Sequence, residues 1–584
     1  MSPPGAKPTG AKPPGAAGLL PLLKPYSGLI GLLLALTILA NSLNLLVPRL
    51  ISHAIDTFTQ PGFALGPIIL QFALVALLIF GFTYGQSIVQ TFASEKVAKD
   101  LRVRLVAKIS VQTYGFVETV SPAKLLTNLT SDVDAVKLFV SQAVASIISS
   151  VFLIVGASVL LLSINWRLGL SILGIIPVIG ITLSLALSKV RHLFKKAQET
   201  VDWLNRVINE SILGASLIRI ICAQDIEFEK FKAANTQARE IGLSILRLFA
   251  GLIPVITLAA NLATFTILLL GGHFVIGGTM SLGEFTAFNT YLSILIFPLM
   301  ILGFMSNVIA QSSASYMRLG LVLNAKDQQK TGTLTELNGN IAIENVSLAY
   351  GEKRVLKDVS LAARAGSSTA IIGPTAAGKT QLLYLLIGLL KPTSGTVLYD
   401  GQPLDAWDAD ALHRQVGFVF QDSVLFNLTL RENIAFSNTS DEASLQRAIR
   451  AAELDDFIAT LPQGLDTIVS ERGSSLSGGQ KQRVMLARAL ALNPKVLLLD
   501  DFTARVDSNT EQAILTNVHE QYPGITLISV TQKISSVEHY DQIILLMEGE
   551  VLAVGTHQHL METSPEYVQI YDSQRSTSTY ELHT

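Results

Sequence analysis

The sequence predicts an all-α membrane domain of six transmembrane helices followed by a soluble α/β domain. Hydrophobic residues make up 49% of the 584 residues and charged residues only 15%. The mean hydropathy of +0.45 exceeds what a soluble protein of this length shows. Apolar runs fill the first half of the chain, whereas the second half changes to short strands and helices between Gly, Pro and Asp turns. A chain this long also exceeds one ordinary core, so at least two domains are expected.

Residues 1–23 are expected to form a disordered arm. They repeat a Gly-Ala-Lys-Pro theme, a composition that buries too little apolar surface to offset the entropy of ordering it. Prolines and glycines also stand where the apolar core of a secretory signal would follow, so no such signal is predicted. The single cysteine, Cys222, excludes an intrachain disulfide.

Residues 24–311 are predicted to form the membrane domain. They contain apolar runs that are each long enough to cross about 30 Å of hydrocarbon. The six runs are 27–47, 67–86, 139–164, 168–187, 248–271 and 285–310.

Basic residues concentrate in the two long segments between runs two and three and between runs four and five. The short loops almost lack them, Arg167 being the clear exception. The positive-inside rule therefore places the two long segments and both termini in the cytoplasm. Val97, Leu101, Leu105 and Ile109 recur at helical spacing, so the helices should extend beyond the bilayer on that side. We expect a multi-pass protein of the bacterial inner membrane.

Past residue 311 the sequence predicts a linker over 312–340, a soluble domain over 341–575 and a short tail over 576–584. The soluble domain contains a glycine-rich loop between an apolar strand at 369–372 and a helix at 381–390. Such a loop closes its backbone N–H groups around phosphates at a helix N-terminus. Its last two residues would neutralise phosphate charge and offer a hydroxyl to Mg²⁺. The loop consists of Gly373, Pro374, Thr375, Ala376, Ala377, Gly378, Lys379 and Thr380.

Two further motifs also predict binding of phosphate groups and Mg²⁺. The apolar run 496–499 ends in Asp500 and Asp501, an arrangement that holds the Mg²⁺ of a nucleotide. A second anion-binding helix start follows the pattern Leu-Ser-Gly-Gly-Gln. This second motif consists of Leu476, Ser477, Gly478, Gly479 and Gln480. Two phosphate sites in one domain indicate a shared nucleotide.

In this order the motifs resemble those of the ATP-binding cassette (ABC) family, specifically exporter half-transporters with the membrane domain first. The resemblance covers residues 24–575 and implies an α/β P-loop cassette domain that binds ATP and Mg²⁺. It also implies that two cassettes pack head to tail, so that the Leu-Ser-Gly-Gly-Gln signature of one closes over ATP held by the other.

The resemblance assigns further roles to single residues. Tyr350 would stack on adenine, Gln421 would sense Mg²⁺ and the attacking water, and Asp507 would lie in the loop that links the two sites. Thr380, Gln421 and Asp500 are the implied metal ligands. The segments 114–132 and 210–227 match the coupling helices that dock on the cassettes.

Three positions depart from the family pattern. Asp501 stands where the family carries glutamate as general base; a base that cannot reach the water loses much of the roughly 10²- to 10⁴-fold rate gain of general-base catalysis. Gln532 replaces a histidine that contacts the γ-phosphate and, unlike histidine, cannot carry charge. Ala376 replaces a glycine where the backbone needs freedom. Asp501, Gln532 and Gln421 are thus the candidate catalytic residues.

We expect a subunit of an exporter that moves a hydrophobic or amphipathic drug or lipid. The hydrolytic residues are altered while the signature is intact, which favours pairing with a second, related half-transporter. A slow homodimer and a regulatory nucleotide-binding subunit without transport are the alternatives. Soluble cassette ATPases that act on DNA share these motifs, but six apolar spans exclude that class and a nucleic-acid partner. The polar span residues Asn41, Asn44, Asn261 and Asn289 are interpreted as interhelical hydrogen bonders.

Overall fold

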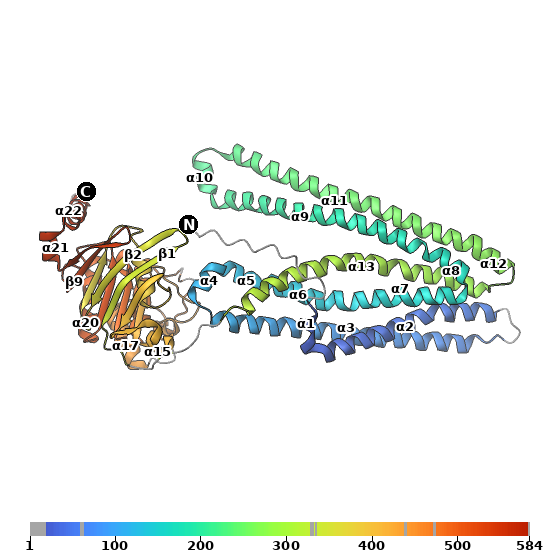
Figure 1. Ribbon diagram of the computed structural model, residues 1–584, viewed down its shortest axis with the longest axis horizontal. Coiled ribbons are helices and arrows are strands. Elements are labelled where there is room, and N and C mark those ends of the chain that lie inside the picture. The colour runs from blue at the N-terminus through green and yellow to red at the C-terminus, as the bar shows by residue number, and fades with distance from the viewer. Residues whose placement is uncertain are drawn as a thin grey trace. The chain divides into compact units, whose positions relative to one another are not determined.

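The computed structural model describes residues 19–58, 63–326, 332, 336–436, 441–470, 473 and 475–581. The chain divides into two compact units. Among the described residues, the helical unit holds 19–111 and 120–326, and the cassette unit holds 112–119 and those from 332 onward. Figure 1 shows long helices in the first and a layered α/β fold in the second.

The helical unit consists of long helices interrupted by short π-helical and 3₁₀ turns. These elements are α1 (Leu20–Leu23), η2 (Lys24–Tyr26), α2 (Ser27–Phe58), α3 (Leu65–Ser110), α4 (Tyr114–Val120, which crosses the unit boundary), α5 (Pro122–Thr127), η3 (Asn128–Asp132), α6 (Val133–Leu138), η4 (Phe139–Ala143), α7 (Val144–Ile164), α8 (Trp166–Leu173), α9 (Ile175–Leu213), α10 (Ala215–Ile220), α11 (Gln224–Thr266), η5 (Ile267–Gly271), α12 (Gly272–Ile276) and α13 (Leu282–Leu323).

Five helical segments within the described residues are long and apolar enough to cross a membrane. They are Pro21–Phe58, Leu65–Ser110, Pro122–Ile164, Gln224–Ile276 and Leu282–Leu323. Five of the six predicted apolar runs lie in them. The fourth run, 168–187, falls on α8 and α9, and several of its side chains lie outside the description. The count of six therefore stays a prediction.

Helix α13 continues to Leu323 and so runs into the segment 312–340 that we expected to be a linker. The continuation is helical because one face of it is buried against the helical unit. That face carries small polar and apolar side chains, namely Ser312, Ser313, Ser315, Leu319 and Val322. Most of the predicted arm 1–23 lies outside the described residues, but Leu20–Leu23 forms the short helix α1.

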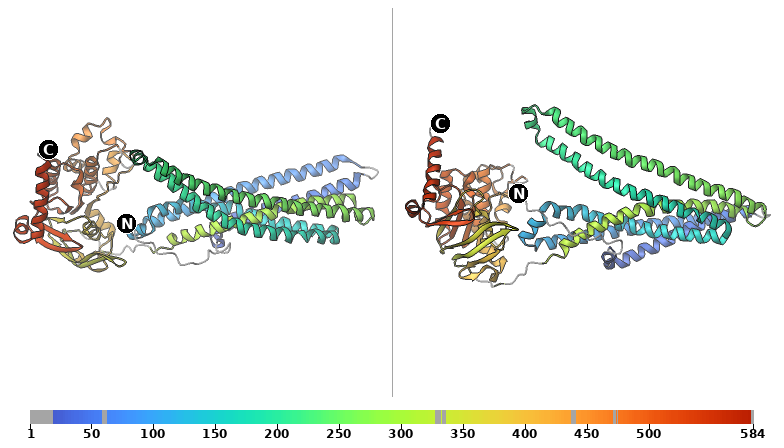
Figure 2. Two further views of the ribbon diagram at one scale, coloured as in Figure 1. Left: turned by 90° about the horizontal axis from the view of Figure 1, so that it is seen from above. Right: turned by 45° about the horizontal axis from the view of Figure 1, so that its top comes forward.

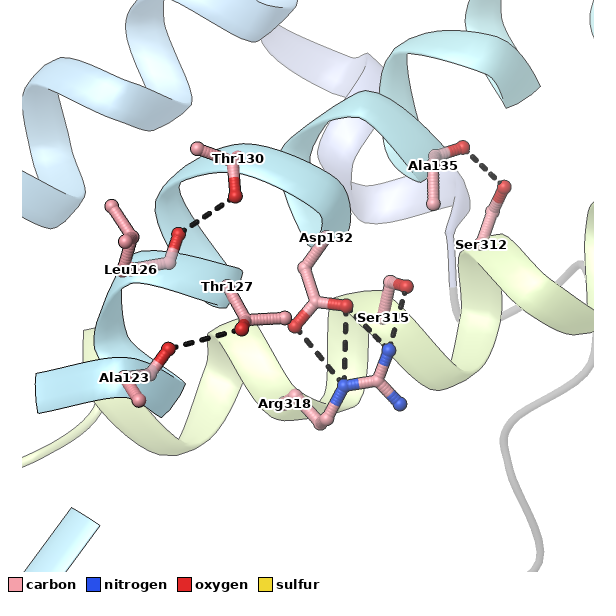
Figure 3. Close-up of polar contacts among 9 residues, drawn as sticks. All are labelled: Ala123, Leu126, Thr127, Thr130, Asp132, Ala135, Ser312, Ser315 and Arg318. Carbon is pink, nitrogen blue, oxygen red and sulfur yellow. Dashed lines mark hydrogen bonds and ion pairs between the residues drawn. The ribbon is translucent and has the colours of Figure 1, made fainter. Parts of the chain in front are cut away.

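An ion pair with a buried carboxylate joins α13 to the last residue of η3 (Figure 3). The Asp132 side chain, 2% exposed, pairs with the Arg318 guanidinium. Arg318 Nε donates to the two carboxylate oxygens at 3.2 and 3.0 Å, and its Nη2 also donates to Ser315 Oγ at 2.9 Å. One turn earlier, Ser312 Oγ donates to the Ala135 carbonyl at 2.5 Å. These contacts fix α13 on η3 and α6.

The polar residues of the spans hydrogen-bond in two ways. Asn41 Nδ2 on α2 donates to Ser149 Oγ on α7 at 2.8 Å, which confirms its predicted interhelical role. Asn289 Nδ2 instead donates to the Phe285 carbonyl of its own helix at 3.3 Å. The prediction of an interhelical hydrogen bond is therefore wrong for Asn289, whose bond stays within α13.

Helices α9 and α11 lie side by side, are joined through α10, and diverge from α7 and α13 toward the α10 end (Figures 1 and 2). This end lies within the predicted coupling segment 210–227. It exposes apolar side chains to an unusual degree, with Leu213 77%, Leu217 60% and Ile220 79% exposed. The surface is thus typical of one that another protein covers.

The cassette unit alternates strands and helices. Its elements are β1 (Ile341–Tyr350), β2 (Lys353–Ala363), β3 (Ser368–Ile372), α14 (Lys379–Leu386), β4 (Ser394–Tyr399), β5 (Gln402–Pro403), η6 (Leu404–Ala406), α15 (Ala409–Gln415), β6 (Val416–Val419), α16 (Leu430–Ile434), α17 (Glu442–Ala451), α18 (Asp455–Ala459), η7 (Gly464–Asp466), α19 (Gly478–Leu490), β7 (Val496–Asp500), η9 (Phe502–Arg505), α20 (Ser508–Gln521), β8 (Thr526–Thr531), β9 (Gln542–Met547), β10 (Glu550–Gly555), α21 (His557–Thr563) and α22 (Pro565–Glu581).

Two sheets organise the cassette unit. The larger has the strand order β10-β9-β3-β8-β7-β6, and all its pairs are parallel except β10 with β9. The smaller has the order β2-β1-β4-β5 and is antiparallel. Strands β3, β7 and β8 are buried along their whole length, as strands of a parallel sheet covered on both faces are. Ligands of such parallel sheets bind beyond the carboxyl ends of the strands.

Candidate nucleotide site

The predicted phosphate loop lies between the end of β3 and the start of α14. Two of its glycines adopt conformations that L side chains rarely take, with φ +155° at Gly373 and +100° at Gly378. A Cβ on Gly373 would lie 2.0 Å from the Leu546 carbonyl oxygen, and one on Gly378 would lie 2.7 Å from Leu356 Cδ2. Ala376 has φ +68°, so its Cβ carries the strain that the missing glycine would avoid.

The first two residues of α14 lie in the loop as the motif predicts. Lys379 is buried, and its Nζ donates to the carbonyls of Gly373 at 2.6 Å and Pro374 at 2.8 Å. Burial lowers the pKa of Lys379, and the charges of Asp501 and Asp500 oppose this shift. The ammonium group thus lies at the loop, where phosphate charge would replace its carbonyl partners.

Asp500 has the environment of a metal ligand. Thr380 Oγ1 donates to Asp500 Oδ1 at 3.1 Å, while Oδ2 is buried and has no hydrogen-bond partner among the described residues. Burial raises the pKa of Asp500 to about 6, against the effect of the Thr380 hydrogen bond. A carboxylate and a hydroxyl beside a phosphate loop fit Mg²⁺, which supplies charge neutralisation to a bound triphosphate. The third predicted ligand, Gln421, is exposed two residues beyond β6.

The two altered hydrolytic positions share one edge of the sheet. Strands β7 and β8 pair with Asp500 opposite Val530, so Asp501 and Gln532 follow adjacent strands. Asp501 has φ +47° and its amide donates to the Val530 carbonyl at 2.9 Å. Burial raises the pKa of the Asp501 carboxyl, and the nearby Lys379 opposes this. The Gln532 carbonyl accepts from Gln574 Nε2 at 2.6 Å.

Gln574 is a residue that the sequence did not single out. It lies on α22, far along the chain, and its Oε1 also accepts from the Ile534 amide at 3.0 Å. The C-terminal helix therefore holds the segment around Gln532 by two backbone hydrogen bonds. No sequence motif links Gln574 to the segment around Gln532, so no signal in the sequence pointed to these contacts.

The signature forms the start of α19. Ser477 Oγ accepts from the Gln480 amide at 3.3 Å, and Gln480 Oε1 accepts from the Ser477 amide at 2.8 Å, a reciprocal capping box. Leu476 packs on the cassette core. In front of the helix start lies an open pocket with a volume of about 450 Å³, whose wall is called the signature surface below. Its lining is Ser477, Gly478, Gly479, Gln480, Arg483, Arg505, Val506, Asp507 and Thr510.

The remaining predicted residues occupy the edges of this region. Asp507 caps α20 by accepting from the Thr510 amide at 3.0 Å, a bond that lowers the pKa of Asp507. Tyr350, at the end of β1, is 41% exposed and so has ring surface available for adenine. None of the residues lining the signature surface belongs to the phosphate loop. The two phosphate sites within one cassette thus do not form a single pocket among the described residues.

Two family models match this chain. The ABC transporter transmembrane region matches residues 30–299, and the ABC transporter model matches residues 356–504. The chain therefore belongs to the ABC transporters and is an exporter chain with fused membrane and ATP-binding domains, an ATPase coupled to transport.

Similar proteins support this assignment along the whole chain. The ABC transporter ATP-binding protein YfiB of Bacillus subtilis is 33% identical over 564 residues, covering 95% of this chain and 98% of that protein. An ATP-dependent lipid A-core flippase of Syntrophus aciditrophicus is 29% identical over 563 residues, covering 95% and 94%. A solved structure of a bacterial Atm1-family ABC exporter with ATP bound has a TM-score of 0.80 and 25% identity, covering 93% of this chain and 98% of that one.

Proposed function

We propose that this chain is one subunit of an exporter and pairs with a second, related half-transporter. The observation that carries this proposal is the contrast between its two phosphate sites. Asp501 and Gln532 replace the hydrolytic residues beside the phosphate loop, whereas the signature surface keeps its capping box and its glycines. An intact signature is what a competent site on a partner would need.

In this arrangement two unequal ATP sites form across the dimer. This chain's phosphate loop and the partner's signature form a slow site, because the shorter Asp501 carboxylate must reach the attacking water from a backbone fixed at φ +47°. The partner's phosphate loop and this chain's signature form the fast site.

The residues of the slow site would bind nucleotide without rapid turnover. Tyr350 stacks on adenine, Lys379 neutralises phosphate charge, and Thr380, Asp500 and Gln421 hold Mg²⁺. ATP retained there stabilises the closed cassette pair, and hydrolysis at the fast site resets it. The coupling segments 114–132 and 210–227 transmit closure to six membrane helices, which alternate between inward- and outward-facing states. The cassette lies in the cytoplasm.

The substrate is proposed to be a lipid or a comparably apolar drug. Ionisable side chains are scarce in the predicted spans, so ions and sugars would find few partners. A groove of about 610 Å³ between α2 and α3 is lined almost entirely by apolar side chains, including Phe58, Phe63 and Phe72. The similarity to a lipid A-core flippase supports the same class of substrate.

The first test compares ATP hydrolysis by this chain alone and together with the product of a neighbouring transporter gene. We expect the lone chain to be nearly inactive and the pair to turn over. In the pair, Lys379→Ala should spare most hydrolysis, whereas Ser477→Glu should abolish it. In the lone chain, the double change Asp501→Glu with Gln532→His should raise hydrolysis at least about tenfold.

Other outcomes would favour the alternatives. Rapid ATP hydrolysis by the unmodified lone chain would contradict the heterodimer and favour an active homodimer. Normal hydrolysis by the pair that no apolar substrate stimulates would favour a regulatory subunit without transport of its own.

A further inference from the structure

Arg505 lies directly against the two signature glycines. It is the last residue of η9 and is exposed. A Cβ on Gly478 would lie 2.8 Å from Arg505 Cδ, and a Cβ on Gly479 would lie 2.8 Å from the Arg505 carbonyl oxygen. The absence of side chains at both glycines is therefore what allows this arginine to approach the start of α19.

The charge around Arg505 favours an anion. Arg483 lines the same concave surface, and the N-terminus of α19 adds its partial positive charge. The signature surface also contains one carboxylate, Asp507, which accepts a hydrogen bond from the Thr510 amide. The second arginine of the surface, Arg483, is already engaged, because its Nη1 donates to the Glu453 carbonyl.

The Arg505 side chain, in contrast, has no ion pair or hydrogen bond with any other described residue. A guanidinium that is exposed and packs against the start of α19 can bind a phosphate through two parallel hydrogen bonds.

We propose that Arg505 binds the terminal phosphate of the ATP that the opposing cassette presents to the signature surface. This inference rests on the proposed function, in which the signature completes a partner's site. The glycine amides and the Ser477 hydroxyl bind phosphate by the family pattern, and Arg505 adds a full positive charge beside them. Loss of that phosphate on hydrolysis removes the partner of Arg505, so this residue makes cassette closure depend on the triphosphate.

The test uses the full chain paired with its partner and measures binding of a slowly hydrolysed ATP analogue and of ADP. Arg505→Ala should weaken binding of the triphosphate analogue about tenfold and change ADP binding less than about twofold. Arg505→Lys should keep part of the affinity as a point charge. Arg364→Ala removes an exposed arginine after β2 and serves as the control, with no change expected.

Two results would overturn the inference: unchanged triphosphate affinity in Arg505→Ala, or equal losses for triphosphate and ADP. Ser477→Glu, measured in parallel, separates this failure from failure of the proposed function. If Ser477→Glu weakens binding of the triphosphate analogue while Arg505→Ala leaves it unchanged, the shared site stands and Arg505 is no ligand. If neither change has an effect, the signature does not complete a partner's site.

Discussion

Replacing Arg318 by methionine should destabilise the helical unit because it leaves a buried carboxylate without its cation. The Asp132 side chain is only 2% exposed and would lose its hydrogen bonds from Arg318. Removing one partner of a fully buried pair costs about 3–5 kcal/mol. Because the Arg318 side chain is 44% exposed, solvent screens part of the interaction and we expect about 2–3 kcal/mol.

The assay is thermal unfolding of the purified, detergent-solubilised chain, followed by size-exclusion chromatography after heating. A loss of this size should lower the midpoint by roughly 4–6 °C in a unit of this length. Asp132→Asn should cost less than Arg318→Met because a neutral amide is cheaper to leave buried than a carboxylate. Adding Arg318→Met to Asp132→Asn should then cost little more.

The ion pair of Arg102 with Asp134 provides a matched control. Its arginine is exposed to the same degree, 43% against 44% for Arg318, but its carboxylate is 59% exposed rather than 2%. Arg102→Met should therefore shift the midpoint by at most about 2 °C, as exposed pairs contribute under about 1 kcal/mol. Equal shifts for the two arginine variants would refute the reasoning from carboxylate burial.

Three further predictions concern the cassette. Asn433 is fully buried and its side-chain amide contacts several backbone groups, so Asn433→Ala should cost about 3 kcal/mol and lower the thermal midpoint of the cassette. Ala376→Gly should relieve the strain at φ +68° and, after the entropy cost of glycine, raise that midpoint by the equivalent of about 0.5–1 kcal/mol. A lowered midpoint would contradict the strain. Gln574→Ala removes the hydrogen bonds to Gln532 and Ile534, so amide exchange at Ile534 should quicken about tenfold; unchanged exchange would show that α22 does not hold this segment.

The nucleotide motifs were predictable because their chemistry is encoded in contiguous residues. The phosphate loop needs left-handed backbone at particular glycines, and the spacing of Gly373 and Gly378 shows this before any fold is known. The capping box of Ser477 and Gln480 likewise spans a single helical turn. The order of membrane domain and cassette followed from hydropathy alone, because lipid and water select different compositions.

The rest depended on contacts between residues far apart in the chain. Asp132 and Arg318 are separated by 186 positions, so their pairing, and with it the extension of α13 into the expected linker, is set by how helices pack. Gln574 reaches the Gln532 segment only because α22 folds back onto the cassette. Arg505 follows the strand that ends in Asp500, yet it lies over the signature because η9 turns it there. Sequence spacing specifies local backbone and charge, whereas the side chains that meet across elements are decided by tertiary packing.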